Sequence, residues 1–224
     1  MRQLFLVRLV LVIGLTLTSF YAVFAQQVDN QEWPKGRIVL TSGDTLFGPI
    51  TYHRSEDIIR VTLANGSVQA FAPVNVSSFT VTDAQNRFSQ TFRPYMWNHD
   101  NDYSDYLAPA FFEVLSEGEY ALVKREELTT RNVNYGPMYA GAGRYYNPYG
   151  YGYGGPRSQT IVLDLFYVYT PKQQIRALRN PKRDLETLFG DKGKEMKQYI
   201  KANKLEYDNA RDLAVIIGQF NRLQ

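Results

Sequence analysis

Apolar and polar residues alternate along much of the chain before residue 180, with the period of two that buries one face of a β-strand. In the stretch 36–52, apolar residues recur at even spacing on both sides of the turn sequence Ser-Gly-Asp, which predicts a β-hairpin. The stretch 59–71 repeats this pattern around Asn65-Gly66, a dipeptide that readily adopts the positive φ angles of a tight turn. These two units predict four antiparallel strands.

The same alternation, rich in branched and aromatic residues, predicts further strands. Two of them enclose the turn 116–119 and form another hairpin. The further strands cover residues 78–81, 87–92, 110–115, 120–124, 160–169 and 175–178. Together with the first two hairpins, they predict about ten short strands in a mainly antiparallel arrangement.

At Asn180 the spacing of apolar residues changes from two to three and four, the period of an α-helix. Asn180 can cap a helix that starts at Pro181, and Gly190 is suited to end it. We expect Asp191 to cap a second helix and Asp208 to start a third, along which one apolar stripe runs. The stripe consists of Leu213, Ile216, Ile217, Phe220 and Leu223.

The order of these elements predicts an α+β fold. We expect an antiparallel β domain over residues 36–179, either a sandwich or a partly open barrel, followed by a three-helix segment over residues 180–224 that packs on it. Amphipathic helices of this length are not stable alone, so their apolar stripes must be buried on the sheet or on each other. Residues 26–35 are predicted to be a short polar linker before the first strand.

The first 25 residues have the layout of a secretory signal peptide. Arg2 and Arg8 flank the start of an apolar run, and small residues precede residue 26. The alternative is an uncleaved membrane anchor, which needs about 20 mostly apolar residues, whereas the apolar stretch 9–24 is shorter and has polar interruptions. We therefore expect removal of residues 1–25 and export of the mature chain to the periplasm, the envelope or the medium, without an integral membrane span.

Net charge and cysteine content exclude several kinds of function for this protein. The chain has 25 Lys and Arg against 22 Asp and Glu, and removing the two arginines of the signal leaves a net charge of +1. This balance does not suit a nucleic-acid partner. Because the chain has no cysteine, disulfides, zinc–thiolate sites, thiol catalysis and lipid attachment to a cysteine are excluded. The sequence predicts no cofactor and gives no indication of an oligomeric state.

The most unusual stretch is a Tyr/Gly-rich segment, residues 134–158, which holds 7 of the 17 tyrosines and 7 of the 16 glycines. So much glycine and so little aliphatic mass cannot form a core, so we expect a long flexible loop between two strands. Its simplest role is that of a spacer. Alternatively, its tyrosine rings and an arginine contact envelope glycan or a partner protein. The candidate binding residues are Tyr135, Tyr139, Arg144, Tyr145, Tyr146, Tyr149, Tyr151 and Tyr153.

Residues 98–105 contain alternating carboxylates that resemble the start of a calcium loop, with Asp100, Asp102 and Asp105 as candidate ligands. However, Asp105 stands where a calcium loop has glycine, and Phe111 stands where it has a bidentate glutamate. A solvated acidic loop is therefore the simpler interpretation.

The chain has only two histidines, His53 and His99. His53 precedes Glu56 and Asp57, but this spacing matches no helix-borne metal motif. On a strand, ligands three positions apart would point to opposite faces. No Gly-x-Ser-x-Gly turn occurs. The glycines of the Tyr/Gly-rich segment lack the preceding strand and following helix of a phosphate-binding loop.

Three parts of the chain resemble a group of uncharacterised exported proteins from Bacteroidetes-type bacteria. They are the opening GxIVLxxGDTLxGxI (36–50), the stretch FxVLxxGxYAL (112–122) and the helical ending YIKxNKL (199–205). The resemblance covers most of the mature chain, and it implies a location in a Gram-negative envelope but no activity. The Tyr/Gly-rich segment is not part of the shared pattern.

These observations predict an exported envelope protein that acts as a non-enzymatic binding or structural module and contacts protein or glycan. Two alternatives stay open. One is a metal- or carboxylate-dependent hydrolase that uses His53 or His99 with nearby acids. The other is a periplasmic assembly or stress factor that binds a partner through its C-terminal helices.

Overall fold

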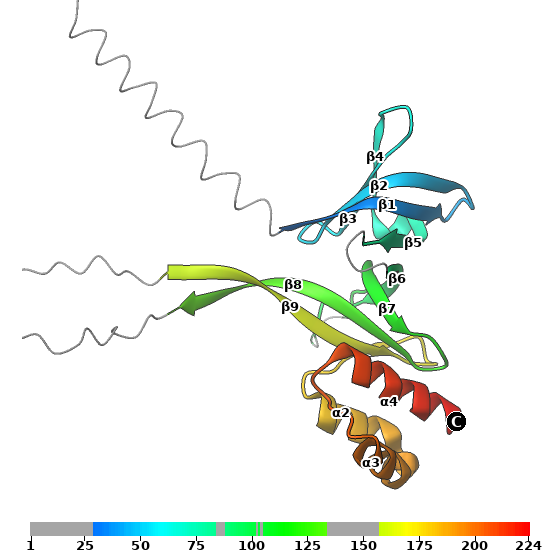
Figure 1. Cartoon of the computed structure of the whole chain (residues 1–224), viewed down its shortest axis with the longest axis vertical. Helices are drawn as coiled ribbons and strands as arrows, with labels where there is room; N and C mark the ends of the chain where they lie inside the picture. The colour runs from blue at the N-terminus through cyan, green and yellow to red at the C-terminus, as the bar shows by residue number, and fades with distance from the viewer. Residues whose placement is uncertain (1–28, 84–87, 102, 104, 134–156) are drawn as a thin grey trace, which may run out of the picture.

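The computed structural model describes residues 29–83, 88–101, 103, 105–133 and 157–224 (Figure 1). The predicted signal peptide, residues 1–25, and most of the Tyr/Gly-rich segment lie outside these ranges. None of the helices in the described ranges is long and apolar enough to cross a bilayer.

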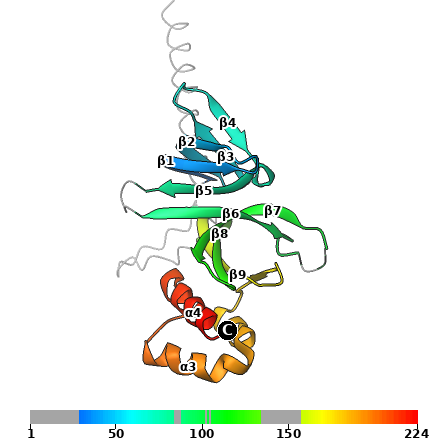
Figure 2. The same cartoon turned by 90° about the vertical axis from the view of Figure 1, so that its right-hand side faces the viewer.

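The described strands form one antiparallel sheet with the order β10-β9-β8-β7-β6-β5-β1-β2-β3-β4 (Figures 1 and 2). A short 3₁₀ turn, η1 (Pro73–Asn75), lies between β4 and β5. The strands are β1 (Asn30–Leu40), β2 (Thr45–His53), β3 (Ile58–Thr62), β4 (Val68–Phe71), β5 (Val76–Thr82), β6 (Ser89–Trp97), β7 (Ala108–Ser116), β8 (Ala121–Val133), β9 (Arg157–Tyr169) and β10 (Ile175–Ala177).

The sheet is strongly curled, so that β1 to β5 wrap around an aromatic core while β7 to β9 face the helices (Figure 2). Inside the first core, Phe79 and Phe92 stack with ring centroids 4.5 Å apart, and Trp33 lies 5.8 Å from Phe92. Because all described strands belong to a single curled sheet, the first predicted alternative, a sandwich of two separate sheets, is wrong, and the second, a partly open barrel, is confirmed as an open half-barrel.

β7 is the wall between two cores. Its residues 110–113 are buried on both faces. Phe111 meets Phe79 edge-on at 5.1 Å in the first core, whereas Phe112 points the other way and meets Tyr167 edge-on at 5.2 Å. A strand covered on both faces carries a continuous apolar run, and this explains why the sequence around Phe111 does not alternate.

β1 corrects the predicted linker at residues 26–35, because the strand already begins at Asn30. Trp33 is 4% exposed and belongs to the first core, so its burial draws this stretch into the sheet. Pro34 is tolerated there because it lies where the register between Trp33 and Gly36 is irregular and no ladder hydrogen bond is required.

The C-terminal segment is helical, as predicted, and packs on the sheet. It contains α2 (Pro181–Phe189), the 3₁₀ turn η2 (Gly190–Lys192), α3 (Gly193–Ala202) and α4 (Ala210–Arg222). Gly190, predicted to end the first helix, is the C-cap of α2 with a φ of 49°. The predicted division into three helices is not confirmed as such, because only the 3₁₀ turn η2 lies between α2 and α3.

The predicted start of α2 is confirmed: the Asn180 side chain accepts a hydrogen bond from the Arg183 amide. The other two predicted caps are wrong. Asp191 lies inside η2, and the α4 cap is Asn209, whose side chain accepts a hydrogen bond from the Asp212 amide at 2.9 Å.

The apolar stripe of α4 is buried on β7 and β8 in a helical core that also contains Leu122 and Val168 of the sheet. Asn221, near the end of α4, fastens the helix to the turn between β7 and β8. Its side chain accepts a hydrogen bond from the Tyr120 amide and donates one to the Tyr120 carbonyl, both at 2.8 Å. Gly118 in that turn has a φ of 151°, and a Cβ there would overlap the Asn221 side chain. The helical segment is therefore an integral part of the fold.

Candidate binding site

The most prominent feature of the fold is a two-stranded arm formed by the outer parts of β8 and β9. The two strands pair without interruption from Ala121↔Tyr169 to Val133↔Arg157. β7 pairs with β8 only as far as Lys124. From Arg125 outward the hairpin therefore leaves the main sheet, and Figure 1 shows it projecting from the body. We call residues 125–133 and 157–165 the β8–β9 arm.

The arm ends at the Tyr/Gly-rich segment. Val133 and Arg157, the residues on either side of 134–156 in the sequence, form the last pair of the ladder. The predicted loop boundary at 158 is corrected, because Arg157 and Ser158 pair with Val133 and Asn132 and so belong to β9. The candidate binding residues of the segment, Tyr135, Tyr139, Arg144, Tyr145, Tyr146, Tyr149, Tyr151 and Tyr153, lie outside the described residues.

An ion pair between Asp57 and Arg125 lies at the fork, the point where β8 stops pairing with β7. Asp57, in the turn between β2 and β3, accepts hydrogen bonds from the Phe111 amide at 3.2 Å and from the Arg125 guanidinium at 3.1 Å. The same guanidinium donates to the Phe111 carbonyl at 2.9 Å. The backbone amide and carbonyl of Phe111, which would otherwise have paired with β8, thus find their partners in the side chains of Asp57 and Arg125. These contacts fix the root of the arm.

Aromatic rings surround this ion pair. The Arg125 guanidinium carbon lies 5.0 Å from the ring centroid of Trp97 and 5.8 Å from that of Phe112. The Tyr52 hydroxyl donates to Asp57 at 2.6 Å. Burial, together with the Asp57 charge, raises the pKa of Tyr52 far above its ordinary value, so this hydroxyl stays protonated and continues to donate.

A second charged cluster lies on the opposite face of β8, beside the first core. Lys124 contacts Glu113 at 2.9 Å, Glu126 at 3.4 Å and Asp164 at 3.5 Å. Arg54 contacts Glu126 at 2.7 Å. Burial alone lowers the pKa of Lys124, but Glu113 and the other acids outweigh it and raise the pKa above its ordinary value. Three carboxylates therefore share two cations, and the cluster keeps an excess of negative charge.

The predicted calcium ligands do not come together among the described residues. Asp100 accepts hydrogen bonds from the Tyr167 hydroxyl at 2.8 Å and from the Trp97 indole at 3.3 Å, so it serves as an acceptor for two residues of the core around Phe112. Burial and Asp100 raise the pKa of Tyr167 far above its ordinary value. Asp105 is exposed to solvent, and Asp102 lies outside the described residues.

The two histidines occupy different elements. His53 ends β2, where it pairs with Asn30 and Ile58, and the His99 ring lies 4.5 Å from the Trp97 ring in the turn after β6. Within the described ranges, no group of three or more His, Cys, Asp or Glu side chains could hold a metal ion.

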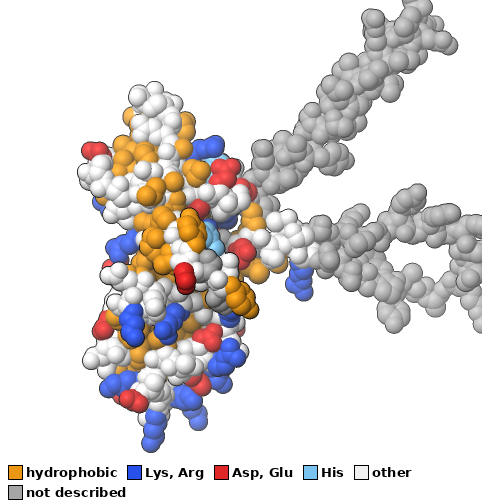
Figure 3. All heavy atoms as spheres, turned by 180° about the vertical axis from the view of Figure 1, so that it is seen from behind, with side chains coloured by type: hydrophobic (Ala, Val, Ile, Leu, Met, Phe, Trp, Pro, Cys, Tyr) orange, Lys and Arg blue, Asp and Glu red, His pale blue; other side chains and the backbone are white. Residues whose placement is uncertain are grey.

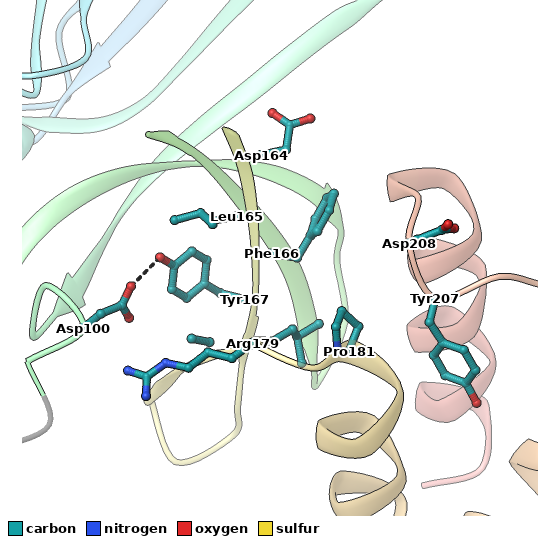
Figure 4. Close-up of a pocket in the computed structure, with 11 residues that line it drawn as sticks. Asp100, Asp164, Leu165, Phe166, Tyr167, Arg179, Pro181, Tyr207 and Asp208 are labelled. Carbon is teal, nitrogen blue, oxygen red and sulfur yellow. Dashed lines mark hydrogen bonds between the residues drawn. The ribbon is translucent and has the colours of Figure 1, made fainter. Parts of the chain in front are cut away.

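A cavity of about 260 Å³ lies where the arm, β10 and the helical segment meet (Figure 4). Its floor is mostly apolar. Figure 4 places Arg179 on the same side as Asp100, whereas Asp164 and Asp208 lie on the other side. The walls are formed by Asp100, Asp164, Leu165, Phe166, Tyr167, Ala177, Leu178, Arg179, Pro181, Tyr207 and Asp208. Asp164 and Asp208 thus place two carboxylates on the side of the cavity away from Arg179.

The surface carries both signs of charge. On the face in Figure 3, acidic and basic side chains are interspersed, with several basic ones near the helical end and a group of hydrophobic side chains in the middle. Exposed large hydrophobic residues include Met96, Tyr106 and Leu107, and also Val162 and Leu163 of the arm.

Sequence reasoning missed the length of β8 and the role of Arg125. The predicted strand ended at Lys124 because charged residues follow it. A usable signal was present further on, since Thr129, Thr130 and Val133 all favour strands.

Comparison with known proteins adds no information about the site, because no protein-family model, curated protein or solved structure matches this chain significantly.

Proposed function

We propose that this protein is an exported, non-enzymatic binding module of the cell envelope that presents its Tyr/Gly-rich segment to a protein or glycan partner at the end of the β8–β9 arm. The observation that carries this proposal is the arm itself. Thirteen residues of β8 pair with thirteen of β9, although the main sheet supports only the inner part of the hairpin.

An isolated two-stranded hairpin is only marginally stable in water, so extending one beyond the sheet has a cost that a simple loop would avoid. Here the root of the arm is reinforced by Asp57 and Arg125, and its inner part by Lys124 and Asp164. At about 3.3 Å per residue, the nine residues of β8 beyond Lys124 span roughly 30 Å. This length carries the segment away from the body, where it can reach an extended surface.

The composition of the segment suits such a role. Tyrosine offers a flat apolar face with a polar tip, which packs on the C–H faces of sugars and on protein surfaces. Glycine between the tyrosines lets the backbone adapt to a partner. Export to the envelope is part of the same proposal and is supported by the signal-like layout of residues 1–25.

Two variants of the mature protein test the proposal. In the first, an Asn-Gly turn replaces residues 134–156 and closes the hairpin directly. In the second, serine replaces the seven tyrosines and the length is kept. Binding is measured against purified cell-wall sacculi, against lipopolysaccharide, and by quantitative crosslinking to native envelope proteins.

We expect both variants to keep the unfolding midpoint of the parent protein and to lose at least about tenfold in binding to one of these three targets, since several stacked rings are lost at once. If both variants bind every target as the parent does, the segment is a spacer and the proposal is wrong. Loss in the shortened variant alone would assign the effect to reach, not to the tyrosines, and would also contradict it.

A further inference from the structure

The outer edge of β9 is paired over only a short part of its length. Among the described residues, β10 pairs with β9 at Tyr167, Val168 and Tyr169, and the Leu178 amide then donates to the Phe166 carbonyl at 2.8 Å. Beyond that point the chain turns away into α2. β9 itself continues for nine more residues, from 165 back to 157.

Strand geometry shows which backbone groups this open edge offers. The Phe166 carbonyl points toward β10, and backbone groups of alternate residues in a strand point to the same side. Asp164, Val162 and Thr160 therefore direct their N–H and C=O groups outward from β9. An incoming strand can pair with these groups as β10 pairs with the inner part of β9.

Side chains beside this edge add both apolar surface and negative charge. Val162 is 40% exposed and Leu163 is 43% exposed. Asp164 borders the 260 Å³ cavity together with Asp208. The Asp164 side chain is 50% exposed and has the longest of the three contacts to Lys124, so it is the member of that cluster whose charge is most open to solvent. The edge thus offers backbone hydrogen bonds, the apolar side chain of Val162 on the same face as Asp164, that of Leu163 on the other face, and an anionic rim.

We propose that the open edge of β9 binds an extended, basic segment of a partner protein by β-strand addition. In antiparallel register, a Lys or Arg lies opposite Asp164 and reaches the cavity rim near Asp208. A β-branched residue two positions further along the segment lies opposite Val162. Cross-strand pairs of these two kinds are favourable on one face of a sheet. This site is separate from the Tyr/Gly-rich segment and goes beyond the function proposed above.

Charge favours this occupant over a second copy of the chain. If two copies paired through β9 about a two-fold axis at Val162, Asp164 of one copy would lie opposite Thr160 of the other. Such a pairing brings no cation to the carboxylates at the rim. A basic peptide neutralises them and also satisfies the backbone groups of the edge.

The test uses an acetylated hexapeptide, Lys-Thr-Val-Thr-Val-Thr, labelled with fluorescein at its C-terminus, and measures fluorescence anisotropy with the mature protein. With lysine opposite Asp164, this peptide covers the edge from residue 164 to residue 159 and stays clear of Phe166, which is paired with Leu178. Two control peptides keep its length. In one, glutamate replaces lysine. In the other, the backbone amides that face β9, those of the lysine and the valines, are N-methylated. Three protein variants are compared with the parent: Val162→Pro, Val162→Thr and Asp164→Asn. Proline at 162 removes an N–H that points away from β8, so the hairpin ladder is retained. Thermal unfolding checks that each variant is folded.

We expect saturable binding of the lysine peptide that Val162→Pro and N-methylation each weaken by at least about tenfold, the equivalent of a lost hydrogen bond. Asp164→Asn weakens it by about threefold, and Val162→Thr leaves it nearly unchanged. Saturable binding that is insensitive to Val162→Pro, or no binding at millimolar peptide, overturns the proposal.

Sedimentation of the parent protein as a dimer that Val162→Pro dissociates would identify a second copy as the occupant and would also overturn it. The variant in which Asn-Gly replaces residues 134–156 keeps the β9 edge, so it should bind the peptide like the parent. Loss of glycan or protein binding in that variant therefore tests the proposed function separately.

Discussion

Replacing Arg125 by leucine tests whether the ion pair at the root of the arm holds β7 and β8 together. The guanidinium has a side-chain exposure of 12%, and the Asp57 carboxylate one of 16%. Leucine keeps much of the packing volume against Trp97 and Phe112 but removes both hydrogen bonds, to Asp57 and to the Phe111 carbonyl. The mostly buried Asp57 carboxylate then keeps only its contacts with Tyr52 and the Phe111 amide.

The expected loss in the free energy of unfolding follows from the contacts that the substitution removes. A hydrogen bond to a charged group contributes about 1.5–3 kcal/mol, one to a neutral carbonyl about 1 kcal/mol, and a cation–π contact about 0.5–1 kcal/mol. Removing one partner of a buried ion pair costs about 3–5 kcal/mol in other proteins. We therefore expect Arg125→Leu to lower the free energy of unfolding by about 3 kcal/mol, and Asp57→Asn, which keeps an acceptor, by about half of that.

Equilibrium urea unfolding followed by tryptophan fluorescence measures both effects, because Trp97 lies against Arg125. A double-mutant cycle with Asp57→Ala and Arg125→Leu should give a coupling free energy of about 1–3 kcal/mol. Hydrogen exchange should also accelerate in the arm, since its root is released. A loss below about 1 kcal/mol for Arg125→Leu, with unchanged exchange in the arm, would refute this account of the fork.

Three further predictions concern stability. Folding raises the pKa of Tyr52 and Tyr167, so their contribution is complete below the unfolded-state value near 10 and is lost as the pH rises above it; the free energy of unfolding should fall there by about 1.4 kcal/mol per pH unit for each tyrosine. Asn221→Ala removes both hydrogen bonds to Tyr120 and should cost about 2 kcal/mol in urea unfolding. Asn209→Ala removes the α4 cap and should cost about 1 kcal/mol.

Each of these predictions has a matched control. Tyr52→Phe should halve the alkaline slope attributed to the two tyrosines, and an unchanged slope would contradict the assignment. Asn221→Asp keeps the acceptor for the Tyr120 amide but places a carboxylate oxygen against the Tyr120 carbonyl, so it should cost at least as much as Asn221→Ala; a smaller loss would contradict the donated hydrogen bond. Asn209→Ser preserves a capping acceptor without placing a second carboxylate beside Asp212, so equal losses for Asn209→Ser and Asn209→Ala would argue against the cap.

Local patterns in the sequence predicted the regular elements well where short-range physics dominates. The turn residues Asn65-Gly66 correctly indicated the β3–β4 hairpin, and Asn180 with Pro181 correctly indicated the start of α2. They failed at two element boundaries, one where the tertiary core adds a strand residue and one where a neighbouring residue makes the cap. Trp33 is drawn into the first core, so β1 begins inside the predicted linker, and Asn209 caps α4 in place of Asp208.

Some features of the candidate site could be predicted from local sequence, and others could not. The sequence identified the Tyr/Gly-rich segment by composition alone, but it could not show that the segment ends a paired arm, because the charged residues that follow Lys124 conceal the continuation of β8. Nor could it show that Asp57 lies beside Arg125, since 68 positions separate them along the chain. The cavity beside Asp164 and Asp208 depends equally on distant segments that only the tertiary structure brings together.

By itself, therefore, the sequence determined the antiparallel strands, the helical ending, the absence of thiol chemistry and the signal-like first residues. These follow from periodicity and composition, which act over a few neighbouring positions. Tertiary structure decided the curl of the sheet, the double burial of β7, the projecting arm and the open edge of β9. Those features depend on which distant side chains satisfy each other's charges and backbone groups, and this is settled only when the whole chain packs.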